Sequence, residues 1–546
     1  MIRINQMKLD IEHTKEDLEK KVLKTLRIKR DELLELQIRK QSVDARKKPE
    51  LYYVYSVDVQ VKDEAKVRKN VKNKQVQFQV KPNIYHFPDS GEVVLEHRPV
   101  IIGTGPAGLF CGYMLAMHGY RPILLERGAD VEERTRDVET FWKTGVLNPA
   151  SNVQFGEGGA GTFSDGKLNT LVKDKDGRGR EVMQIFTRHG APEEITYQSK
   201  PHIGTDVLSS VVKEMRLYIC EHGGEVRFYS QVTDIRTEKT NGTETLKALE
   251  VQDLKNGESY ILETELAVLA IGHSARDTFA MLYRHGLPMQ AKSFAVGVRM
   301  EHPQEMINQD QYGESYSRKY QTELPAAPYK LTASLENGRG VYTFCMCPGG
   351  YVVNSSSEPG RLVVNGMSYS KRDGKNANSA VIVTVTPEDF GSDEPLAGVE
   401  FQRKLEEAAY REGNGKIPVQ LFGDFCENQK SVKLGEVIPQ MKGKYQLANT
   451  RNIFPEIIAE SLEKGVLAFD KKLPGYARTD AVISGVESRT SSPVRITRDE
   501  TLQSEFRGIY PCGEGAGYAG GITSAAMDGM KIAEMIAAIY RPFVTN

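Results

Sequence analysis

Cysteine is scarce in this sequence, with six among 546 residues. So few cysteines in so long a chain exclude a disulfide scaffold and are typical of a reducing compartment. Long apolar runs are also missing, since none approaches the roughly 20 residues that a membrane-spanning helix needs. The opening stretch, MIRINQMKLDIEHTKEDLEKK, is charged throughout and lacks the apolar segment of a signal peptide. We therefore expect a cytoplasmic protein with no membrane partner.

Net charge is almost absent, because 72 lysines and arginines face 73 aspartates and glutamates. No global field therefore draws the chain to nucleic acid or to a membrane surface. The composition, 39% hydrophobic and 27% charged, excludes a disordered or fibrous protein. The length exceeds what one hydrophobic core usually supports, so we expect several domains.

Changes of pattern along the chain predict four segments. Residues 1–98 are expected to form a small α+β module of order β-α-β-β, with a Lys-rich connecting arm at its end. Residues 99–290 alternate continuously apolar strands with helices, which is typical of a parallel α/β sheet. Residues 291–480 are expected to form an inserted sheet-rich substrate or cap domain, and residues 481–546 to close the α/β domain. The predicted fold class is α/β, with a Rossmann-like domain at its centre.

Glycine is the informative residue, and its first cluster follows the strand that begins at Pro99. The cluster has the spacing G-x-G-x-x-G and opens a helix. Gly103 permits the tight turn, Gly105 lets a pyrophosphate approach the backbone, and Gly108 lets helix and strand pack closely. The helix start at Pro106 and Ala107 offers amide donors and a positive dipole to phosphates. The pattern predicts a dinucleotide site.

An acidic residue stands where such a site needs one. Glu126, followed by Arg127, ends the next apolar strand, at the spacing of about 20 residues seen in dinucleotide-binding folds. Its carboxylate is expected to accept hydrogen bonds from an adenosine ribose and to repel a phosphorylated one. This first motif alone does not separate FAD from NAD.

A second glycine-rich turn between a strand and a helix, which we call a glycine corner, lies near the end of the chain and distinguishes FAD from NAD. The strand ending at Cys512 leads into Gly513 and Glu514, and further glycines open the last helix. Such a corner suits the ribityl chain and the pyrimidine edge of a flavin, whose reduced form carries negative charge. Backbone amides at the helix start would stabilise that charge; they belong to Gly521, Ile522 and Thr523. The alternative is an ordinary strand–glycine–helix corner.

With these motifs the sequence resembles the two-dinucleotide-binding-domain flavoproteins of the glutathione reductase superfamily. Within that superfamily it resembles the bacterial group of FAD-dependent or NAD(FAD)-utilising dehydrogenases. The stretches that carry the resemblance are Gly103–Gly108 with Glu126 and Arg127, Gly156–Lys167, Cys347–Gly350, Gly485–Thr490 and Gly513–Thr523. The resemblance implies a Rossmann-like FAD-binding domain with FAD as cofactor. Most members have Asp at the late acidic position, so Glu514 is a departure that keeps the charge and reaches one methylene further.

The resemblance also implies further cofactor contacts. A glycine-rich loop wraps the pyrophosphate and flavin ring in related proteins, and its contacts carry over to Gly158, Gly159, Gly161, Thr162 and Ser164. Lys167 is placed near the flavin or the substrate, with a solvent-facing lysine as the alternative. Ala270 and Gly272 resemble the turn that passes the flavin phosphates, and Val232 the strand end that touches adenine.

Three further residues carry reactive side chains. A C-x-C pair on a strand, Cys345 and Cys347, is expected to place both thiols on one face. We interpret them first as buried structural cysteines, with a substrate-site role as the alternative and no metal site, because no further ligands accompany them. His273 is interpreted as a locally hydrogen-bonded turn histidine, with an acid or base role as the alternative. No catalytic residue is assigned.

The predicted function is an FAD-dependent oxidoreductase that transfers a hydride or two electrons between flavin N5 and a small-molecule substrate. A second strand-linked G-x-G-x-x-G is missing, which leaves two sources of electrons: the substrate itself, or NAD(P)H docking transiently. One alternative is a tRNA-modifying flavoprotein that binds RNA through residues 1–98, where 22 lysines and arginines face 16 aspartates and glutamates. Others are a reductase that saturates isoprenoid or lipid substrates and a non-enzymatic flavin-binding regulator.

Overall fold

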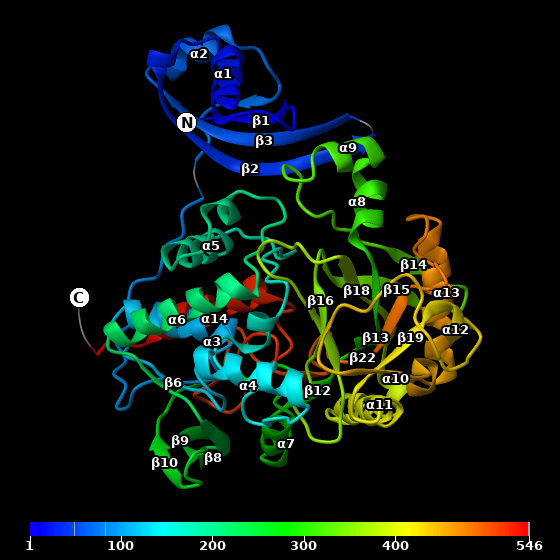
Figure 1. Ribbon diagram of the computed structural model, residues 1–546. Coiled ribbons are helices and arrows are strands. Elements are labelled where there is room, and N and C mark those ends of the chain that lie inside the picture. Colours follow the sequence, from blue (N-terminus) through cyan, green and yellow to red (C-terminus); the bar gives the residue numbers. More distant parts are fainter. Residues whose placement is uncertain (49, 82, 544–546) are drawn as a thin grey trace.

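The computed structural model describes residues 1–48, 50–81 and 83–543. The chain begins with a four-stranded antiparallel sheet of order β2-β3-β1-β4, which lies at the top of Figure 1. Its elements are β1 (Ile2–Leu9), α1 (Lys15–Leu26), β2 (Leu33–Lys47), β3 (Glu50–Val61), α2 (Glu64–Asn70) and β4 (Val76–Gln77). Thr14 caps α1 through a reciprocal hydrogen-bonded pair with Asp17. The predicted strand–helix–strand–strand order is present.

The Lys-rich segment of residues 62–81 differs from the prediction, because it is not merely a connecting arm. The Asp63 carboxylate caps α2 by accepting a hydrogen bond from the backbone N–H three residues on, at 2.9 Å. Val67, Val71 and Val76 are buried in the core of the module. These valines pack the segment against the sheet. The many lysines between them made the segment look like an exposed connection in the sequence.

A parallel five-stranded sheet of order β24-β11-β5-β6-β7 lies at the heart of the next part of the chain. Its strands are β5 (Val100–Ile102), β6 (Ile123–Leu125), β7 (Glu225–Arg227), β11 (Ala267–Leu269) and β24 (Ile509–Pro511). The four strands other than β7 are completely buried, as expected for a parallel sheet covered on both faces. The chain therefore returns at residue 509 to complete a sheet begun at residue 100.

Helices cover one face of this sheet, and Figure 1 shows α6, α14 and α3 stacked beside one another. They are α3 (Pro106–Met117), α5 (Arg178–Arg188), α6 (Thr205–Glu221) and α14 (Ile522–Ile539), with α4 (Val131–Thr144) nearby. The first and last of these touch backbone to backbone, since a Cβ on Gly529 would lie 2.1 Å from the carbonyl oxygen of Ala107. The two glycine-led helices thus pack directly against each other.

The opposite face packs against α7 (Arg276–Arg284) and a three-stranded antiparallel sheet. Its strands are β8 (Ser230–Thr240), β9 (Thr243–Asp253) and β10 (Ser259–Glu263). Val232, expected at a strand end, lies instead near the start of β8, and the strand before it, β7, belongs to a different sheet. Tyr229 turns the chain between them with a left-handed φ of 52°.

Residues 289–496 contain a seven-stranded sheet of order β14-β15-β18-β13-β22-β19-β21. Its strands are β13 (Phe294–Pro303), β14 (Thr332–Ser334), β15 (Gly340–Cys347), β18 (Asn376–Val385), β19 (Ile417–Leu421), β21 (Tyr445–Leu447) and β22 (Val482–Glu487). Smaller pairings involve β12 (Met289–Ala291), β16 (Tyr351–Asn354), β17 (Val364–Met367), β20 (Met441–Lys442) and β23 (Val494–Ile496). The surrounding helices are α8 (Gln304–Tyr312), α9 (Glu314–Lys319), α10 (Pro387–Phe390), α11 (Ala397–Glu412), α12 (Phe422–Cys426) and α13 (Glu456–Asp470).

One strand of this sheet lies past residue 480, where the sequence places the end of the inserted domain. β22 pairs with β13 and β19, and Val482, Ile483 and Val486 are buried in the same apolar core. The sheet therefore continues into the segment assigned to the closing part. The other domain boundaries stay a prediction.

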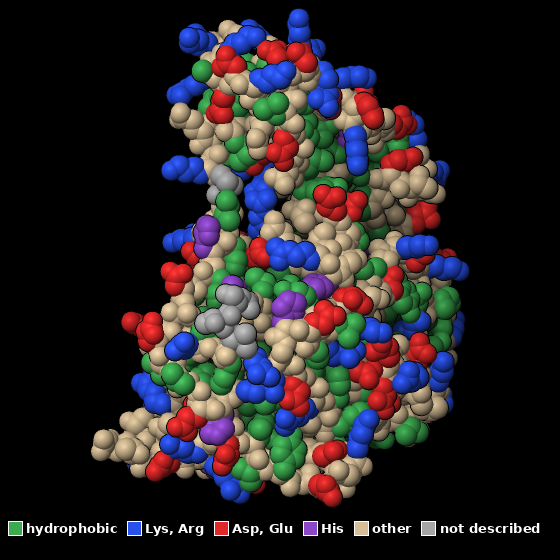
Figure 2. All heavy atoms as spheres, turned by 90° about the vertical axis from the view of Figure 1, so that its left-hand side faces the viewer, with side chains coloured by type: hydrophobic (Ala, Val, Ile, Leu, Met, Phe, Trp, Pro, Cys, Tyr) green, Lys and Arg blue, Asp and Glu red, His purple; other side chains and the backbone are tan. Residues whose placement is uncertain are grey.

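The N-terminal module contacts both larger parts of the molecule through β2 and β3. The backbone of Gln41 exchanges hydrogen bonds with Tyr197 and Ser199, each at 2.8 Å, while the Tyr53 hydroxyl donates to the Glu323 carbonyl at 2.7 Å. Figure 2 shows lysines and arginines over this module, with aspartates and glutamates among them. Across the described residues, no helix combines the length and apolarity needed to cross a bilayer.

Candidate cofactor and substrate cavity

A cavity of about 940 Å³ lies where the five-stranded and seven-stranded sheets meet. One side is formed by the loops that follow the carboxyl ends of β5, β6, β11 and β24. The other side comes from β15, β17 and the residues at the end of β22. Ligands of open α/β sheets bind outside the carboxyl ends of the strands, so this is the expected position for a nucleotide.

Most of the residues predicted from the sequence to contact the cofactor line this one cavity. They are Gly103, Gly105, Pro106, Ala107, Glu126, Arg127, Gly159, Gly161, Ser164, Lys167, Val232, Ala270, Gly272, Glu514, Gly521 and Ile522. The two glycine corners meet there: a Cβ on Gly161 would lie 3.1 Å from Ile522 and 3.8 Å from Pro106. Segments from the beginning, middle and end of the α/β part therefore share one wall.

The other predicted residues lie behind the cavity lining; they are Gly108, Gly158, Thr162, Gly513 and Thr523. A Cβ on Gly108 would stand 1.9 Å from the Gly103 carbonyl oxygen, so this glycine serves helix–strand packing. The Thr523 hydroxyl donates to the Leu168 carbonyl at 2.8 Å and ties α14 to the glycine-rich loop. These residues shape the loops that line the cavity.

The start of α3 offers unused amide groups to the cavity. Its N-cap residue is Gly105, and no side chain in the described part of the chain caps this helix. A Cβ on Gly159, whose φ is +62°, would stand 2.9 Å from the Gly105 Cα atom, so two glycine backbones face each other closely. A helix N-terminus beside side-chain-free backbone fits a phosphate group.

Glu126 is more deeply integrated than the sequence indicates. Its carboxylate accepts hydrogen bonds from the backbone N–H groups of Thr104 (3.0 Å), Gly128 (2.9 Å) and Gly156 (3.0 Å), and from the Thr104 hydroxyl (2.8 Å). Glu126 therefore joins three loops of the cavity wall, in addition to facing the place predicted for a ribose. Nothing in the local sequence indicates the contact with Gly156.

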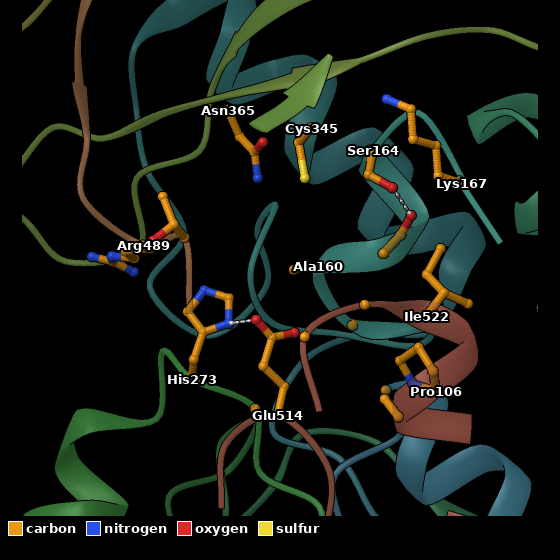
Figure 3. A pocket seen from close by; sticks show the side chains of 18 of the residues that line it. Pro106, Ala160, Ser164, Lys167, His273, Cys345, Asn365, Arg489, Glu514 and Ile522 are labelled. Carbon is orange, nitrogen blue, oxygen red and sulfur yellow. Dashed lines mark hydrogen bonds and ion pairs between the residues drawn. The ribbon is translucent and has the colours of Figure 1, made fainter. Parts of the chain in front are cut away.

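At the other end of the cavity, His273 and Glu514 point toward each other (Figure 3). His273 Nδ1 lies 3.6 Å from Glu514 Oε1, and His273 Nε2 is buried with no hydrogen-bond partner among the described residues. Burial raises the pKa of Glu514 to about 7, against the opposing effect of Lys292. Burial, with the positive charge of Arg489 nearby, lowers the pKa of His273 to about 3. A neutral imidazole thus faces a carboxyl group that holds or releases a proton near neutral pH.

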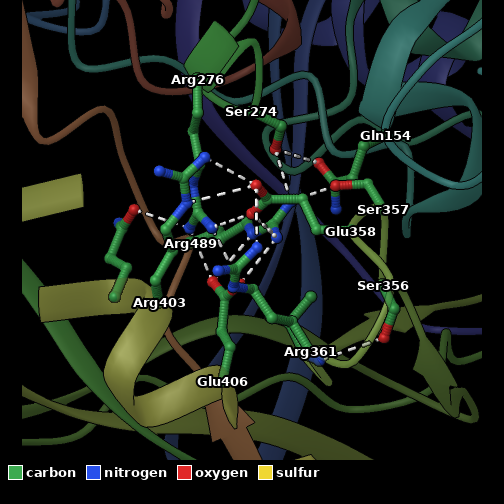
Figure 4. A network of polar contacts seen from close by, with 12 residues as sticks. Gln154, Ser274, Arg276, Ser356, Ser357, Glu358, Arg361, Arg403, Glu406 and Arg489 are labelled. Atoms are coloured by element: carbon green, nitrogen blue, oxygen red, sulfur yellow. Dashed lines mark hydrogen bonds and ion pairs between the residues drawn. The ribbon is translucent and has the colours of Figure 1, made fainter. Parts of the chain in front are cut away.

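A buried ionic network supports the loop that carries His273 (Figure 4). Glu406 on α11 bonds Arg276 at 2.7 Å and Arg489 at 2.8 Å. Although burial opposes ionisation, the two guanidinium groups hold the pKa of the Glu406 carboxyl far below its usual value. Arg489 also donates to the Ser274 hydroxyl at 3.2 Å, next to His273. The network links α7, α11 and the end of β22, and only Arg489 lay in a stretch that the sequence singled out.

Both strand cysteines line the cavity, although a bulge in β15 leaves one exposed and the other buried. The register of β15 against β18 shifts between Phe344 and Cys347, and Cys345 has a left-handed φ of 41°. Cys345 is exposed in the cavity, while Cys347 is buried at the cavity wall and its thiol donates to the Cys345 carbonyl at 3.2 Å. Desolvation by the surrounding cavity walls raises the pKa of Cys345, although its side chain is exposed in the cavity, so it is a thiol at neutral pH. Among the described residues, no group of three histidines, cysteines or acids is placed to hold a metal ion.

Two family models match this chain, one over the seven-stranded sheet and one over the first part of the N-terminal module. Residues 293–490 match the family model described as FAD-dependent protein, C-terminal domain-like, and residues 1–60 match a domain of unknown function. An uncharacterized protein of Clostridium beijerinckii is 49% identical over 539 residues, which is 98% of each chain. This chain belongs to the same family. That family therefore extends over the N-terminal module, the cavity and both sheets.

Solved structures resemble this chain only weakly, with low TM-scores. The FAD complex of glycerol-3-phosphate dehydrogenase from Bacillus halodurans is 10% identical with a TM-score of 0.35, and the match covers 82% of this chain and 65% of that one, just under two thirds. Quinol fumarate reductase FrdA of E. coli is 10% identical with a TM-score of 0.37, covering 82% and 70%. L-Amino acid deaminase from Proteus myxofaciens is 12% identical with a TM-score of 0.31, covering 83% and 93%.

Proposed function

We propose that this protein binds FAD in the cavity and acts as an FAD-dependent oxidoreductase on a small-molecule substrate. The observation that carries the proposal is that both glycine corners, at Gly105 and Gly521, line one cavity. Each is the N-cap of a helix, and no described side chain caps either helix. The match of residues 293–490 to a family of FAD-dependent proteins supports the same cofactor.

The residues present fit a dinucleotide laid across the carboxyl ends of the strands. Glu126, Arg127 and Val232 would hold the adenosine part, and the α3 amides beside Gly159 would hold the pyrophosphate. The amides at the start of α14 would hold the ring, because that helix end favours negative charge. Bound FAD supplies the capacity to accept or donate a hydride.

The chain's own side chains orient the reactants and bind or release protons. The pair formed by His273 and Glu514 is able to hold one proton at the predicted flavin end of the cavity. Buried apolar side chains on the opposite wall, such as Tyr329 and Met346, keep water away from that end. The buried Arg489–Glu406 pair fixes the loop that carries His273.

The electron donor is proposed to be the substrate itself. Among the described residues, the five-stranded sheet is the one parallel sheet with a glycine-rich turn after a strand, and the predicted FAD site uses it. NAD(P)H as a donor would therefore have to dock transiently, without a nucleotide-binding sheet of its own.

The RNA-binding alternative has less support. A groove on the N-terminal module is lined by Arg3, Arg39, Lys40 and Arg46. Arg3 and Arg39 are paired with Asp58, at 2.6 and 3.1 Å, and a further acid lies beside Arg46, so much of the positive charge is neutralised. The lipid-saturating alternative stays a prediction.

Anaerobic reduction tests the proposed activity. The purified protein is mixed separately with NADH, NADPH, hydroxy acids, amino acids and sugar phosphates, while the visible flavin band is followed. We expect at least one small organic substrate to bleach the band with saturation, and NADH and NADPH to do so slowly and without saturation. A flavin that dithionite reduces but none of these compounds reduces would contradict the oxidoreductase and favour a flavin-binding regulator.

A further inference from the structure

A cluster of positive charge lies on the cavity wall beside the glycine-rich loop. Lys167 and Lys200 line the cavity, and Arg372 stands behind them. Asp165 is the carboxylate within reach: it lies 3.0 Å from Arg372 Nε and 3.5 Å from Lys167 Nζ. The Lys167 ammonium is shielded from solvent and makes no hydrogen bond within the described structure. Arg372 and Lys167 therefore share one acid, and Lys200 has no ion-pair partner among the described residues.

The remaining acids of the cavity do not balance this charge. Glu126 is bonded by backbone amides, Asp165 by Arg372, Glu487 by Arg299 at 2.6 Å, and Glu514 faces His273. Lys200 and Lys330 line the cavity as well, and neither forms an ion pair with any residue that the structure describes. Partial desolvation, together with the neighbouring Arg372 and Lys167, lowers the pKa of Lys200, although the residue is exposed at the cavity rim.

Asn365 completes a set of hydrogen-bond donors at the same end. Its Oδ1 atom accepts hydrogen bonds from Arg299 Nη2 at 3.1 Å and from the Gly366 backbone N–H at 2.7 Å. These bonds fix the amide so that its NH₂ group faces the cavity, beside the Cys345 thiol (Figure 3). Figure 3 shows Asn365, Cys345 and Lys167 along the side opposite His273 and Glu514. An amide NH₂ and an ammonium group together suit a ligand group that only accepts hydrogen bonds.

We propose that the substrate is a small organic anion whose carboxylate or phosphate oxygens are bound by Lys167, Asn365 and Lys200. The inference rests on the proposed function for the identity of the reaction, but anion binding itself does not require a flavin. Lys167, which the sequence placed near flavin or substrate, is assigned to the substrate. The bound anion supplies the counter-charge that the cavity's own acids do not.

Equilibrium binding of simple probes tests this proposal. The purified protein is titrated with sodium benzoate and inorganic phosphate, with benzyl alcohol as the uncharged counterpart of benzoate, at constant ionic strength. Binding is followed by the flavin difference spectrum and, independently, by the thermal unfolding midpoint, which rises when a ligand binds the folded state. We expect saturable binding of at least one of the two anions and none of benzyl alcohol. The two anion titrations distinguish a carboxylate from a phosphate site.

Variants locate the binding. We expect Lys167→Met to raise the anion Kd at least about tenfold, because it removes a charge-assisted hydrogen bond. Asn365→Asp should abolish binding, since it keeps the oxygen that contacts Arg299 but replaces the donor with a negative charge. Lys416→Met makes the same charge change at an exposed lysine outside the cavity lining and should leave Kd unchanged.

Two results would overturn the proposal. One is benzyl alcohol binding as well as benzoate, and the other is an anion Kd that Lys167→Met and Asn365→Asp leave unchanged. A protein that takes up no flavin would contradict the proposed function alone, because the thermal midpoint still reports anion binding. The two hypotheses therefore fail separately.

Discussion

The Nδ1 atom of His273 lies 3.6 Å from Oε1 of Glu514, which joins the loop after β11 to the loop after β24. The seven-stranded sheet is formed by residues that come between these two in the sequence. The contact therefore forms only once the end of the chain has returned to the five-stranded sheet. It marks the end of the cavity predicted to hold the flavin ring.

Gly105→Val should remove FAD while leaving the fold intact. A Cβ at Gly105 would lie no closer than 3.9 Å to a neighbouring atom, so the new side chain occupies cavity space instead of displacing protein. We expect the ratio of flavin to protein after gel filtration to fall at least about tenfold. A fully loaded yellow variant would contradict the predicted pyrophosphate position.

Gly108→Ala is the matched contrast to that variant. Its Cβ would stand 1.9 Å from the Gly103 carbonyl oxygen, so the helix has to shift. We expect the thermal midpoint of the flavin-free protein to fall by several degrees, corresponding to about 1–3 kcal/mol of overpacking. Equal midpoints for Gly108→Ala and Gly105→Val would show that the two glycines do not have the separate roles assigned to them.

Glu126→Ala should lower both cofactor retention and stability. The substitution leaves three backbone N–H groups of the cavity loops without their acceptor. Because unsatisfied buried donors cost about 1–3 kcal/mol each, we expect the free energy of unfolding of the flavin-free protein to fall by about 3 kcal/mol or more. Urea unfolding measures this change. An unchanged urea midpoint, with flavin lost, would restrict Glu126 to ribose binding.

The pH dependence of stability should carry the signature of Glu514. Its pKa in the folded protein is about 7, above the ordinary value of 4.5, so its contribution to stability is complete below about pH 4.5 and is lost as pH rises through 7. We expect the flavin-free protein to lose about 1–2 kcal/mol relative to Glu514→Gln between pH 5 and pH 8. Denaturant unfolding at each pH checks this.

His273 changes the stability in the opposite direction. Its pKa is lowered to about 3, so its contribution to stability is lost as pH falls below about 6.5. The histidine is present in both proteins compared, so its contribution largely cancels from their difference. A difference that is constant with pH, or that grows in favour of the wild-type protein as pH rises, would contradict the buried, protonated state of Glu514.

Glu406→Gln should be strongly destabilising. It removes the fully buried carboxylate that Arg276 and Arg489 share, and leaves them only the partly exposed carboxylate of Glu358. Removing one partner of a buried ionic network costs about 3–5 kcal/mol. The control is Glu460→Gln, which breaks an exposed pair with Lys464 on α13 and should cost less than about 0.5 kcal/mol. Denaturant unfolding distinguishes the two, and similar losses would show that the network is not important for folding.

Local features of the fold follow directly from the sequence. The strand–turn–helix at Gly103 and the glycine-led start of α14 each depend on residues adjacent in the chain. Periodicity and glycine placement therefore reveal them. The same holds for the acid Glu126 at the end of β6.

Features that depend on distant residues could not be predicted in this way. The Glu406 network joins Arg276 and Arg489, which lie 130 and 83 positions away from it. The bulge at Cys345 arises from pairing with β18, and the alternation of side chains along one strand does not reveal it. The donor set at Lys167 and Asn365 likewise forms only when the two sheets come together.

The nucleotide released when the purified protein is denatured tests the central proposal most directly. Chromatography with mass spectrometry identifies the released compound, and its amount is compared with the protein concentration after reconstitution with FAD, FMN and NAD in separate samples. We expect one FAD per chain and no retained FMN or NAD. Retention of FMN or NAD in its place, or no retained nucleotide at all, would contradict the assignment of the cavity to FAD.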